Sequence, residues 1–433
     1  MEFYATRRGV EISKSYASVC KTVREHLTVA PSPTTSVPRP FRFPVYFENP
    51  ETLTVPMHWA RSQFPFVPIR ETRTPGQTMQ YTFQGELKES LDQPAAVRAT
   101  LESLRNHRGA VLSLRTGGGK TCCGLYIACE LQAKTLILVH KKFLAEQWTD
   151  RIDQFVPGAS VSYIQGSTWD TSGDFVIAMV QTLISRPANP DLYDAFKLLI
   201  FDEAHHVAAK VFCQSMCGLN APYTLGLTAT PTRKDGLERL IHFFLGPMSY
   251  VATPDDAVAK TVTVHRVTYR SPEYANPPPT NVRGDLDYTG LVSLLASDMT
   301  RTLMIADLVE SALSEYDTLI LTHRRAHVTA LVDALVRKGL DAAPYIGGTK
   351  TIPGSRIIVS TYAYVSEAFD QPRLRALVLA TPASDIVQAV GRIMRGDGAH
   401  PPVVYDIVDA WGPCYAQAAK RRRQYTAAGF NQN

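Results

Sequence analysis

The sequence predicts an α/β protein with two parallel sheets, because apolar runs of strand length alternate with helical patterns on both sides of a proline-rich stretch. A chain of 433 residues is also too long for one hydrophobic core, so more than one domain is expected. The apolar runs are KTLILVH (134–140), DFVIAMV (174–180), KLLIFDE (197–203), DTLILTH (317–323), SRIIVST (355–361) and ALVLATP (376–382).

Two proline-rich breaks set the expected domain boundaries. The first, from Ala30, predicts an irregular connection, and the second, SPEYANPPPTNVRG, predicts a stiff linker between lobes. We expect an N-terminal accessory region at 1–78 and a first lobe at 79–270. The linker at 271–285 and a second lobe at 286–433 would follow.

Composition narrows the class of protein. The net charge of +5 permits a nucleic-acid partner without requiring one. The first 13 residues are charged and no apolar run reaches 18 residues, so we expect a soluble intracellular protein without a membrane partner. The pattern does not indicate an oligomeric state.

The cysteines are scattered, which favours structural thiols in a reducing compartment. The nearest approach to a metal cluster is His205, His206, Cys213 and Cys217, and this spacing fits no familiar zinc finger. We therefore expect no bound zinc.

The stretch VLSLRTGGGKTCCGLYIACEL (111–131) combines a short strand, three glycines and a helical pattern. Gly117, Gly118 and Gly119 would let backbone N–H groups converge on an anion at a helix N-terminus. Lys120 would reach the β- and γ-phosphates of ATP, and Thr121 would ligate Mg²⁺. The alternative is a glycine-rich turn with an exposed lysine.

An acidic pair follows another strand in LLIFDEAHH. Because parallel strands present their carboxyl ends at one edge, we expect Asp202 and Glu203 near the glycine loop. Asp202 would hold Mg²⁺ and Glu203 would polarise the attacking water. The alternative is an acidic N-cap of the following helix.

Two further patterns suit a phosphate-cleaving site. LTAT places the hydroxyls of Thr228 and Thr230 after a strand, where they can link the nucleotide to a nucleic-acid groove, although threonine is ordinary in strands. QAVGRIMR presents Arg392 and Arg395 on one helix edge, with Gln388 a turn earlier. An arginine supplied from the opposite lobe would stabilise charge on the γ-phosphate, whereas the alternative is a solvated basic edge.

The order of these motifs resembles the superfamily 2 DEAH-box helicases and translocases over roughly residues 79–425. It is most similar to the branch with the xeroderma pigmentosum group B helicase, phage UvsW and large-DNA-virus helicases. The matching segments are LRTGGGKT (114–121), TLILVHKKFLAEQW (135–148), DEAH (202–205), LGLTATPTRKDG (225–236), TLILTHRRAHVTAL (318–331), STYAYVSEAFD (360–370) and QAVGRIMR (388–395).

The resemblance implies two tandem RecA-like lobes that use ATP and Mg²⁺. It assigns Gln93 to adenine recognition, with an exposed glutamine at a helix start as the alternative, and Asp370 to the ribose. Candidate nucleic-acid contacts are Lys141, Lys142, Arg233, Lys234, Arg324, Arg325 and Thr361. The basic run KRRRQY (420–425) is better explained as a solvated helix end.

Three departures from the family pattern stand out. Ala389 replaces a usual arginine, Ala368 replaces a usual glycine, and residues 1–78 carry no motif.

The main hypothesis is an ATP-driven translocase or helicase acting on DNA in replication, repair or transcription, in the 3′ to 5′ direction. The alternatives are an RNA-directed or transcript-releasing ATPase and a nucleic-acid-binding module with degenerate ATPase parts.

Overall fold

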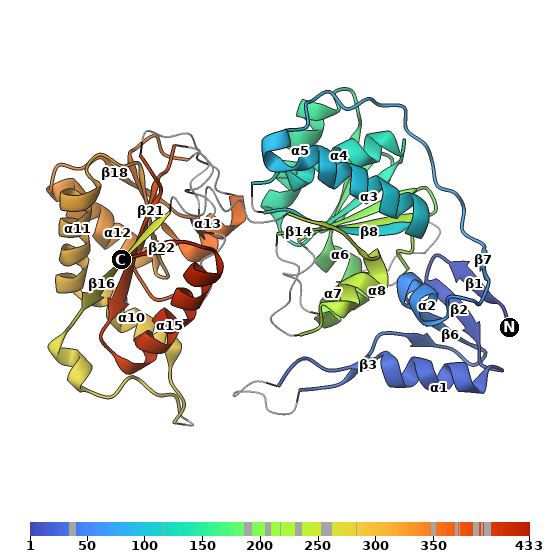
Figure 1. Cartoon of the computed structure of the whole chain (residues 1–433), viewed down its shortest axis with the longest axis horizontal. Coiled ribbons are helices and arrows are strands. Elements are labelled where there is room, and N and C mark those ends of the chain that lie inside the picture. Colours follow the sequence, from blue (N-terminus) through green and yellow to red (C-terminus); the bar gives the residue numbers. More distant parts are fainter. Residues whose placement is uncertain are drawn as a thin grey trace. The chain divides into compact units, whose positions relative to one another are not determined.

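The computed structural model describes residues 1–33, 40–115, 117–185, 193–203, 209–216, 218–229, 236–252, 262–282, 284–347, 352–368, 371, 373–383, 389–390, 393 and 400–433. The chain forms two compact units, Met1–Ala252 and Thr253–Asn433, and each contains a mainly parallel sheet (Figure 1). The predicted α/β fold is therefore confirmed. None of the described helices has the length and hydropathy needed to span a membrane.

The main sheet of the first unit has the order β11-β10-β12-β9-β13-β14-β8-β15. Its strands are β8 (Gly109–Ser113), β9 (Thr135–Val139), β10 (Val161–Gln165), β11 (Thr168–Trp169), β12 (Phe175–Met179), β13 (Leu198–Asp202), β14 (Tyr223–Thr228) and β15 (Met248–Val251). All neighbours pair in parallel except β10 and β11. Because β14 lies between β8 and β13, the glycine loop and the acidic pair leave the same sheet edge.

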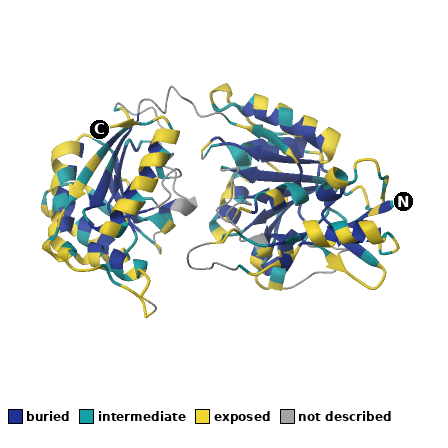
Figure 2. Ribbon diagram, turned by 60° about the horizontal axis from the view of Figure 1, so that its bottom comes forward, coloured by how far each residue is buried: buried dark blue, intermediate teal, exposed yellow. Residues whose placement is uncertain are grey.

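Helices cover both faces of this sheet (Figure 1). One face carries α3 (Gln93–His107), α4 (Lys120–Glu130) and α5 (Lys142–Phe155), and the other carries α6 (Val180–Ser185), α7 (Ala209–Met216) and α8 (Arg239–Leu245). Leu198 and Ile200 of β13 pack into the first layer and Leu199 and Phe201 into the second, because side chains alternate along a strand. The central strands β8, β9 and β13 are accordingly buried along their whole length, and Figure 2 shows buried strands in the interior of the molecule.

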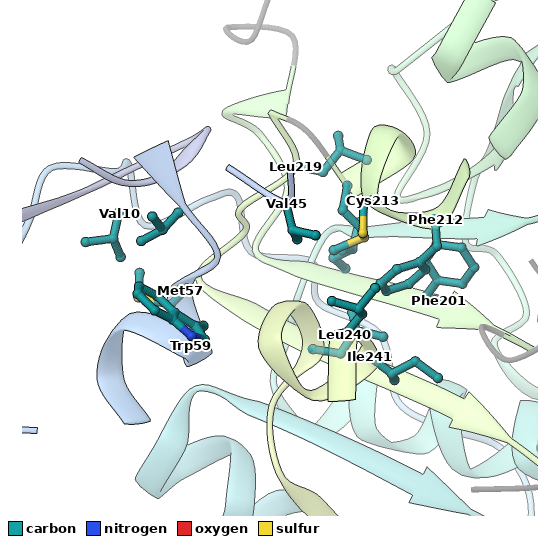
Figure 3. Close-up of a cluster of buried hydrophobic side chains, with 14 of the residues drawn as sticks. Val10, Val45, Met57, Trp59, Phe201, Phe212, Cys213, Leu219, Leu240 and Ile241 are labelled. Carbon is teal, nitrogen blue, oxygen red and sulfur yellow. The ribbon is translucent and has the colours of Figure 1, made fainter. Parts of the chain in front are cut away.

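The N-terminal residues form a second, five-stranded sheet in the order β5-β6-β2-β1-β7. The elements of this region are β1 (Phe3–Thr6), β2 (Gly9–Ser13), α1 (Ala17–His26), β3 (Thr28–Val29), β4 (Phe43–Pro44), β5 (Phe47–Glu48), β6 (Thr52–Val55), α2 (Met57–Gln63) and β7 (Ile69–Glu71). Trp59 and Val45 share one hydrophobic cluster with Phe212 and Leu240 of the α7–α8 layer (Figure 3). The guanidinium of Arg7 adds hydrogen bonds to Asp194 and Thr74. This region is thus packed onto the larger sheet.

The second unit contains a seven-stranded sheet in the order β18-β19-β17-β20-β21-β16-β22. Its strands are β16 (Thr263–Tyr269), β17 (Thr318–Thr322), β18 (Ala342–Tyr345), β19 (Ile357–Thr361), β20 (Ala376–Leu379), β21 (Val403–Asp409) and β22 (Asn431–Gln432). Its helices are α10 (Tyr288–Ser297), α11 (Met299–Leu313), α12 (Arg325–Arg337), α13 (Tyr362–Ala368) and α15 (Gly412–Ala427).

The position of the second proline-rich segment differs from the expected linker. The strand β16 precedes it and already pairs with β21, so residues 271–285 lie inside the second unit. Ser271 caps a short 3₁₀ helix, η4 (Pro272–Ala275), within this segment. The pattern of prolines identified an irregular connection, but it could not reveal that a strand of the second sheet comes before it.

Candidate active site

The glycine loop joins β8 to α4 through conformations that favour glycine. Gly117 and Gly119 have φ angles of 82° and 78°, and α4 begins at Lys120. A Cβ atom on Gly119 would lie 2.2 Å from Nε2 of Gln93, so a side chain there would collide with the start of α3. The loop therefore brings backbone N–H groups to a helix N-terminus, where an anion is favoured.

Gln93 holds this loop from the side. It is the first residue of α3 and is only 3% exposed. Its Nε2 donates to the carbonyl oxygen of Gly118 at 3.0 Å, and its Oε1 accepts from the backbone N–H of Lys88 at 2.9 Å. The alternative of an exposed glutamine is therefore wrong, and adenine recognition stays a prediction.

The acidic pair stands where β13 ends. Asp202 is the last residue of the strand and is 4% exposed. Glu203 has a φ angle of 51°, a left-handed conformation that is uncommon outside glycine and costs free energy. The backbone N–H of Glu203 donates to the carbonyl oxygen of Leu227 at 2.9 Å, which anchors this sharp turn to β14.

The turn brings the acidic pair to the glycine loop. Nζ of Lys120 lies 3.0 Å from Oε1 of Glu203, and both side chains are mostly buried. The two groups come from opposite neighbours of β14, 83 positions apart in the sequence, so only the fold brings them together. The expected proximity of these residues is observed, whereas their catalytic roles stay predictions.

Burial dominates the electrostatics of Asp202. Its pKa is raised to about 6 by removal from water and then by the nearby Glu203 carboxylate, while the Lys120 ammonium opposes the increase. The indole N–H of Trp148 also favours the charged form, because it donates to Oδ2 of Asp202 at 2.9 Å. The protein thus keeps a poorly solvated carboxylate at this edge.

The chemistry of the residues present fits a magnesium ion. The ion prefers hard oxygen ligands and usually binds through one or two protein groups together with substrate phosphates. Asp202 supplies a carboxylate, and Thr121 supplies a hydroxyl in the first turn of α4. A buried carboxylate with a raised pKa also gains a partner for its charge when a cation binds.

Other predicted residues of the first unit lie along the same edge. Thr228 is the buried last residue of β14, and the backbone N–H of Leu114 donates to its carbonyl oxygen at 3.1 Å. Lys141 precedes α5, which follows β9. Lys142 is exposed, and its Nζ lies 3.7 Å from Oε1 of Glu146.

In the second unit, the predicted residues follow paired strands. Arg324 donates to Ser293 Oγ at 3.2 Å and to the carbonyl oxygen of Thr289 at 2.8 Å, while Arg325 donates to the carbonyl oxygen of Gly347. Thr361 ends β19, where its register partner in β17 is Thr322. These residues therefore share one edge of the second sheet.

The segment Ala380–Ala383, which follows β20, is held by features that sequence reasoning missed. Its four successive carbonyl oxygens accept hydrogen bonds from Arg301, Tyr362, Tyr288 and Arg421, in that order. The guanidinium of Arg421 is buried and also binds Asp406, with Nη2 2.7 Å from Oδ1. The interpretation of 420–425 as a solvated helix end is therefore wrong for Arg421, whereas Lys420, Arg422 and Arg423 are exposed.

Several predicted site residues lie outside the described part of the chain. They are Thr230, Arg233, Lys234, Asp370, Gln388, Arg392 and Arg395. The same holds for His205, His206 and Cys217 of the potential metal cluster, whereas Cys213 is buried. The predicted roles of these residues stay predictions.

Comparison with known proteins identifies relatives that are named as helicases or translocases. Residues 86–233 match the family described as type III restriction enzyme, res subunit. A protein of Acanthamoeba polyphaga mimivirus, whose name proposes an ATP-dependent RNA helicase, is 27% identical over 97% of this chain and 84% of its own. A DNA 3′–5′ translocase of Sulfurisphaera tokodaii is 32% identical over 40% of this chain and 38% of its own.

Among solved structures, the helicase domain of Pyrococcus furiosus Hef is similar with a TM-score of 0.50 and 14% identity. The match covers 77% of this chain and 98% of the Hef domain. At this identity the likeness concerns the fold, and it agrees with two α/β units in tandem.

Proposed function

Because this chain belongs to the superfamily 2 helicases, and is therefore a helicase-family nucleic-acid ATPase, we propose that it moves along DNA by hydrolysing ATP. The observation that carries the ATP-hydrolysing part of the proposal is the 3.0 Å ion pair between Lys120 and Glu203, beside the buried Asp202. It joins a glycine loop suited to phosphates to a carboxylate suited to orienting water.

In the proposed reaction, the phosphates of ATP take Lys120 as their cation and lie against the backbone N–H groups after Gly119. Glu203, released from that ion pair, accepts a hydrogen bond from the attacking water. Asp202 and Thr121 would hold Mg²⁺, which neutralises charge on the phosphates. Gln93, which binds the glycine loop through Gly118, would couple adenine recognition to the position of that loop.

We further propose that the two units act as lobes of one motor. Arg392 and Arg395 belong to the second unit by sequence, and an arginine that reaches the γ-phosphate accelerates hydrolysis 10³-fold or more in comparable sites. Nucleic acid bound to both lobes would favour the state in which that arginine is delivered. Arg392→Ala should therefore keep ATP and DNA binding while losing most of the DNA-stimulated turnover.

One named relative favours DNA as the proposed track. The Sulfurisphaera relative is named as a DNA translocase and its match covers 178 residues at 32% identity. Basic groups at strand edges, such as Lys141 and Lys142, bind phosphates without reading sequence, which suits movement. The name of the mimivirus relative supports the alternative of an RNA-directed ATPase.

The experiment is an ATPase assay of the purified chain with single-stranded DNA, duplex DNA or RNA of matched length. We expect DNA to stimulate turnover more than RNA, and the stimulation to fall as salt rises. Glu203→Gln is the matched control, because it should bind nucleotide and hydrolyse it slowly with every nucleic acid. Stimulation by RNA alone would replace the DNA proposal with the RNA-directed one, and wild-type turnover by Glu203→Gln would reject the assigned chemistry.

A further inference from the structure

Trp148 is a fully buried residue of α5 whose polar atom has a specific partner. The helix buries Leu144, Ala145 and Ile152 at helical spacing, so tryptophan at position 148 continues an ordinary apolar face. Its indole N–H, however, reaches through that layer and donates to Oδ2 of Asp202 at 2.9 Å. A core residue therefore touches the predicted magnesium ligand.

The fold makes room for this contact at Gly124. A Cβ atom on this residue of α4 would lie 3.1 Å from Cη2 of Trp148 and 3.2 Å from Cδ1 of Leu227, which is closer than side chains usually pack. The indole ring thus packs closely against α4, the helix that begins at the glycine loop, while its N–H meets Asp202 at the end of β13. The ring is completely buried, so the surrounding packing restricts the direction in which its N–H points.

We infer that Trp148 is a positioning residue that orients Asp202 for Mg²⁺, an inference that rests on the proposed ATPase function. One carboxylate oxygen, Oδ2, is held by the indole N–H, which restricts rotation of the side chain, and Oδ1 is the oxygen that the inference assigns to the ion. The indole is neutral, so it orients the carboxylate without supplying the positive charge that the metal brings. Groups that orient metal ligands commonly affect metal affinity 10- to 100-fold.

The first experiment replaces Trp148 with phenylalanine, which keeps an aromatic ring and removes the N–H donor. Binding of a fluorescent ATP analogue is titrated with Mg²⁺, and turnover is measured across the same Mg²⁺ series. We expect the Mg²⁺ concentration for half-maximal binding to rise roughly 10-fold, with turnover partly restored at high Mg²⁺. An unchanged Mg²⁺ requirement would overturn the inference.

Trp169→Phe is the matched control. Trp169 lies in the same unit and is partly buried, but its indole nitrogen has no hydrogen-bond partner within the described residues. Its replacement should leave the Mg²⁺ requirement unchanged. An equal increase in both variants would mean that the effect is general loosening of the unit, and would also overturn the inference.

A second substitution protects the test against misfolding. Benzothienylalanine at position 148 has nearly the shape of tryptophan, but sulfur replaces the N–H group. It should fold and show the same increase in Mg²⁺ requirement, whereas wild-type Mg²⁺ dependence would contradict the role of the hydrogen bond. If the wild-type chain neither bound nor hydrolysed ATP, the proposed function itself would fail, which is a different outcome.

Discussion

Asp202 in the first unit and Asp409 in the second occupy equivalent places and have different surroundings. Each is the buried last residue of a strand in a parallel sheet. Asp202 accepts a hydrogen bond from the neutral indole of Trp148. Asp409 receives two from the guanidinium of Arg301, at 2.6 and 3.0 Å, and one from the hydroxyl of Tyr274.

The difference separates a carboxylate that serves structure from one prepared for a cation. Arg301 and Asp409 are both completely buried and form a bidentate pair, so their charges are matched within the protein. Asp202 is buried beside the Glu203 carboxylate, so its charge is poorly compensated and its pKa is raised. A buried carboxylate in that condition gains a counter-charge when a divalent cation binds, whereas Asp409 already has one in Arg301.

The second unit repeats the structural arrangement with Asp406 and Arg421. Both buried arginines extend to carbonyl oxygens that follow β20, Arg301 to that of Ala380 and Arg421 to that of Ala383. The ion pairs therefore attach α11 and α15 to the segment that leads toward the predicted motif at 388–395. In the second unit, the buried arginines therefore hold the backbone of the segment that follows β20 in place.

The largest expected effect on stability comes from breaking the ion pair between Arg301 and Asp409. Arg301→Met should destabilise the chain by about 3–5 kcal/mol, because it leaves Asp409 buried without its cation. The double variant Arg301→Met/Asp409→Leu should recover much of that loss. Urea denaturation measures both, and a single variant as stable as wild type would show that Asp409 does not depend on its arginine.

Glu203→Gln should slow turnover by roughly 10²–10³-fold, about 3–4 kcal/mol in the barrier, since the water-orienting carboxylate is lost. The folded state should lose little stability, because glutamine retains the size of the side chain and the Asp202 carboxylate remains as a counter-charge for Lys120. Single-turnover kinetics and thermal unfolding of the same preparation separate the two effects. A large fall in thermal stability with normal chemistry would place Glu203 with the structural carboxylates.

Asp202→Asn should raise stability at pH 8 without Mg²⁺, by about 1–3 kcal/mol, because it removes a poorly matched buried charge. The sign follows from the raised pKa: the folded state carries no penalty below about pH 4, where Asp202 is protonated in both states. The penalty develops between about pH 4 and 6 and is constant above. The gain should therefore disappear at low pH, and a gain equal at pH 4 and pH 8 would contradict the electrostatic cause.

Lys142→Ala should have the smallest effect on stability, below about 0.5 kcal/mol, since its contact with Glu146 is a surface pair. Its predicted contribution is to nucleic-acid binding, which should weaken and lose part of its salt dependence. Glu146→Ala is the control, because it removes the same ion pair and keeps the lysine. Equal weakening of DNA binding by both variants would assign the effect to the helix surface.

The sheets and the centre of the site were readable from the sequence because their signals are local. Continuous apolar runs predicted strands such as β13 and β17, and three glycines before Lys120 predicted a phosphate loop. The proximity of Asp202 and Glu203 to the glycine loop followed from parallel strand order, whereas the ion pair of Lys120 with Glu203 is an observation of the structure.

The sequence did not indicate which distant strands and side chains pair with one another. The strand β7 pairs with β1 across more than 60 residues, and nothing in either short segment specifies the other. Asp406 and Asp409 interrupt an apolar strand and Arg301 continues the buried face of α11, which is a recognisable sign of buried charge. Which arginine meets which aspartate depends on the tertiary fold, and so does the contact of Trp148 with Asp202.

The most direct test is the effect of Mg²⁺ on nucleotide affinity, measured by isothermal titration of ADP at pH 8 for three chains. Wild type and the stability variant Arg301→Met/Asp409→Leu should both bind ADP more tightly with Mg²⁺. Asp202→Asn should bind ADP equally well without Mg²⁺ and should gain little from adding it. A full Mg²⁺ gain in Asp202→Asn would contradict the claim that this buried carboxylate is kept for a cation.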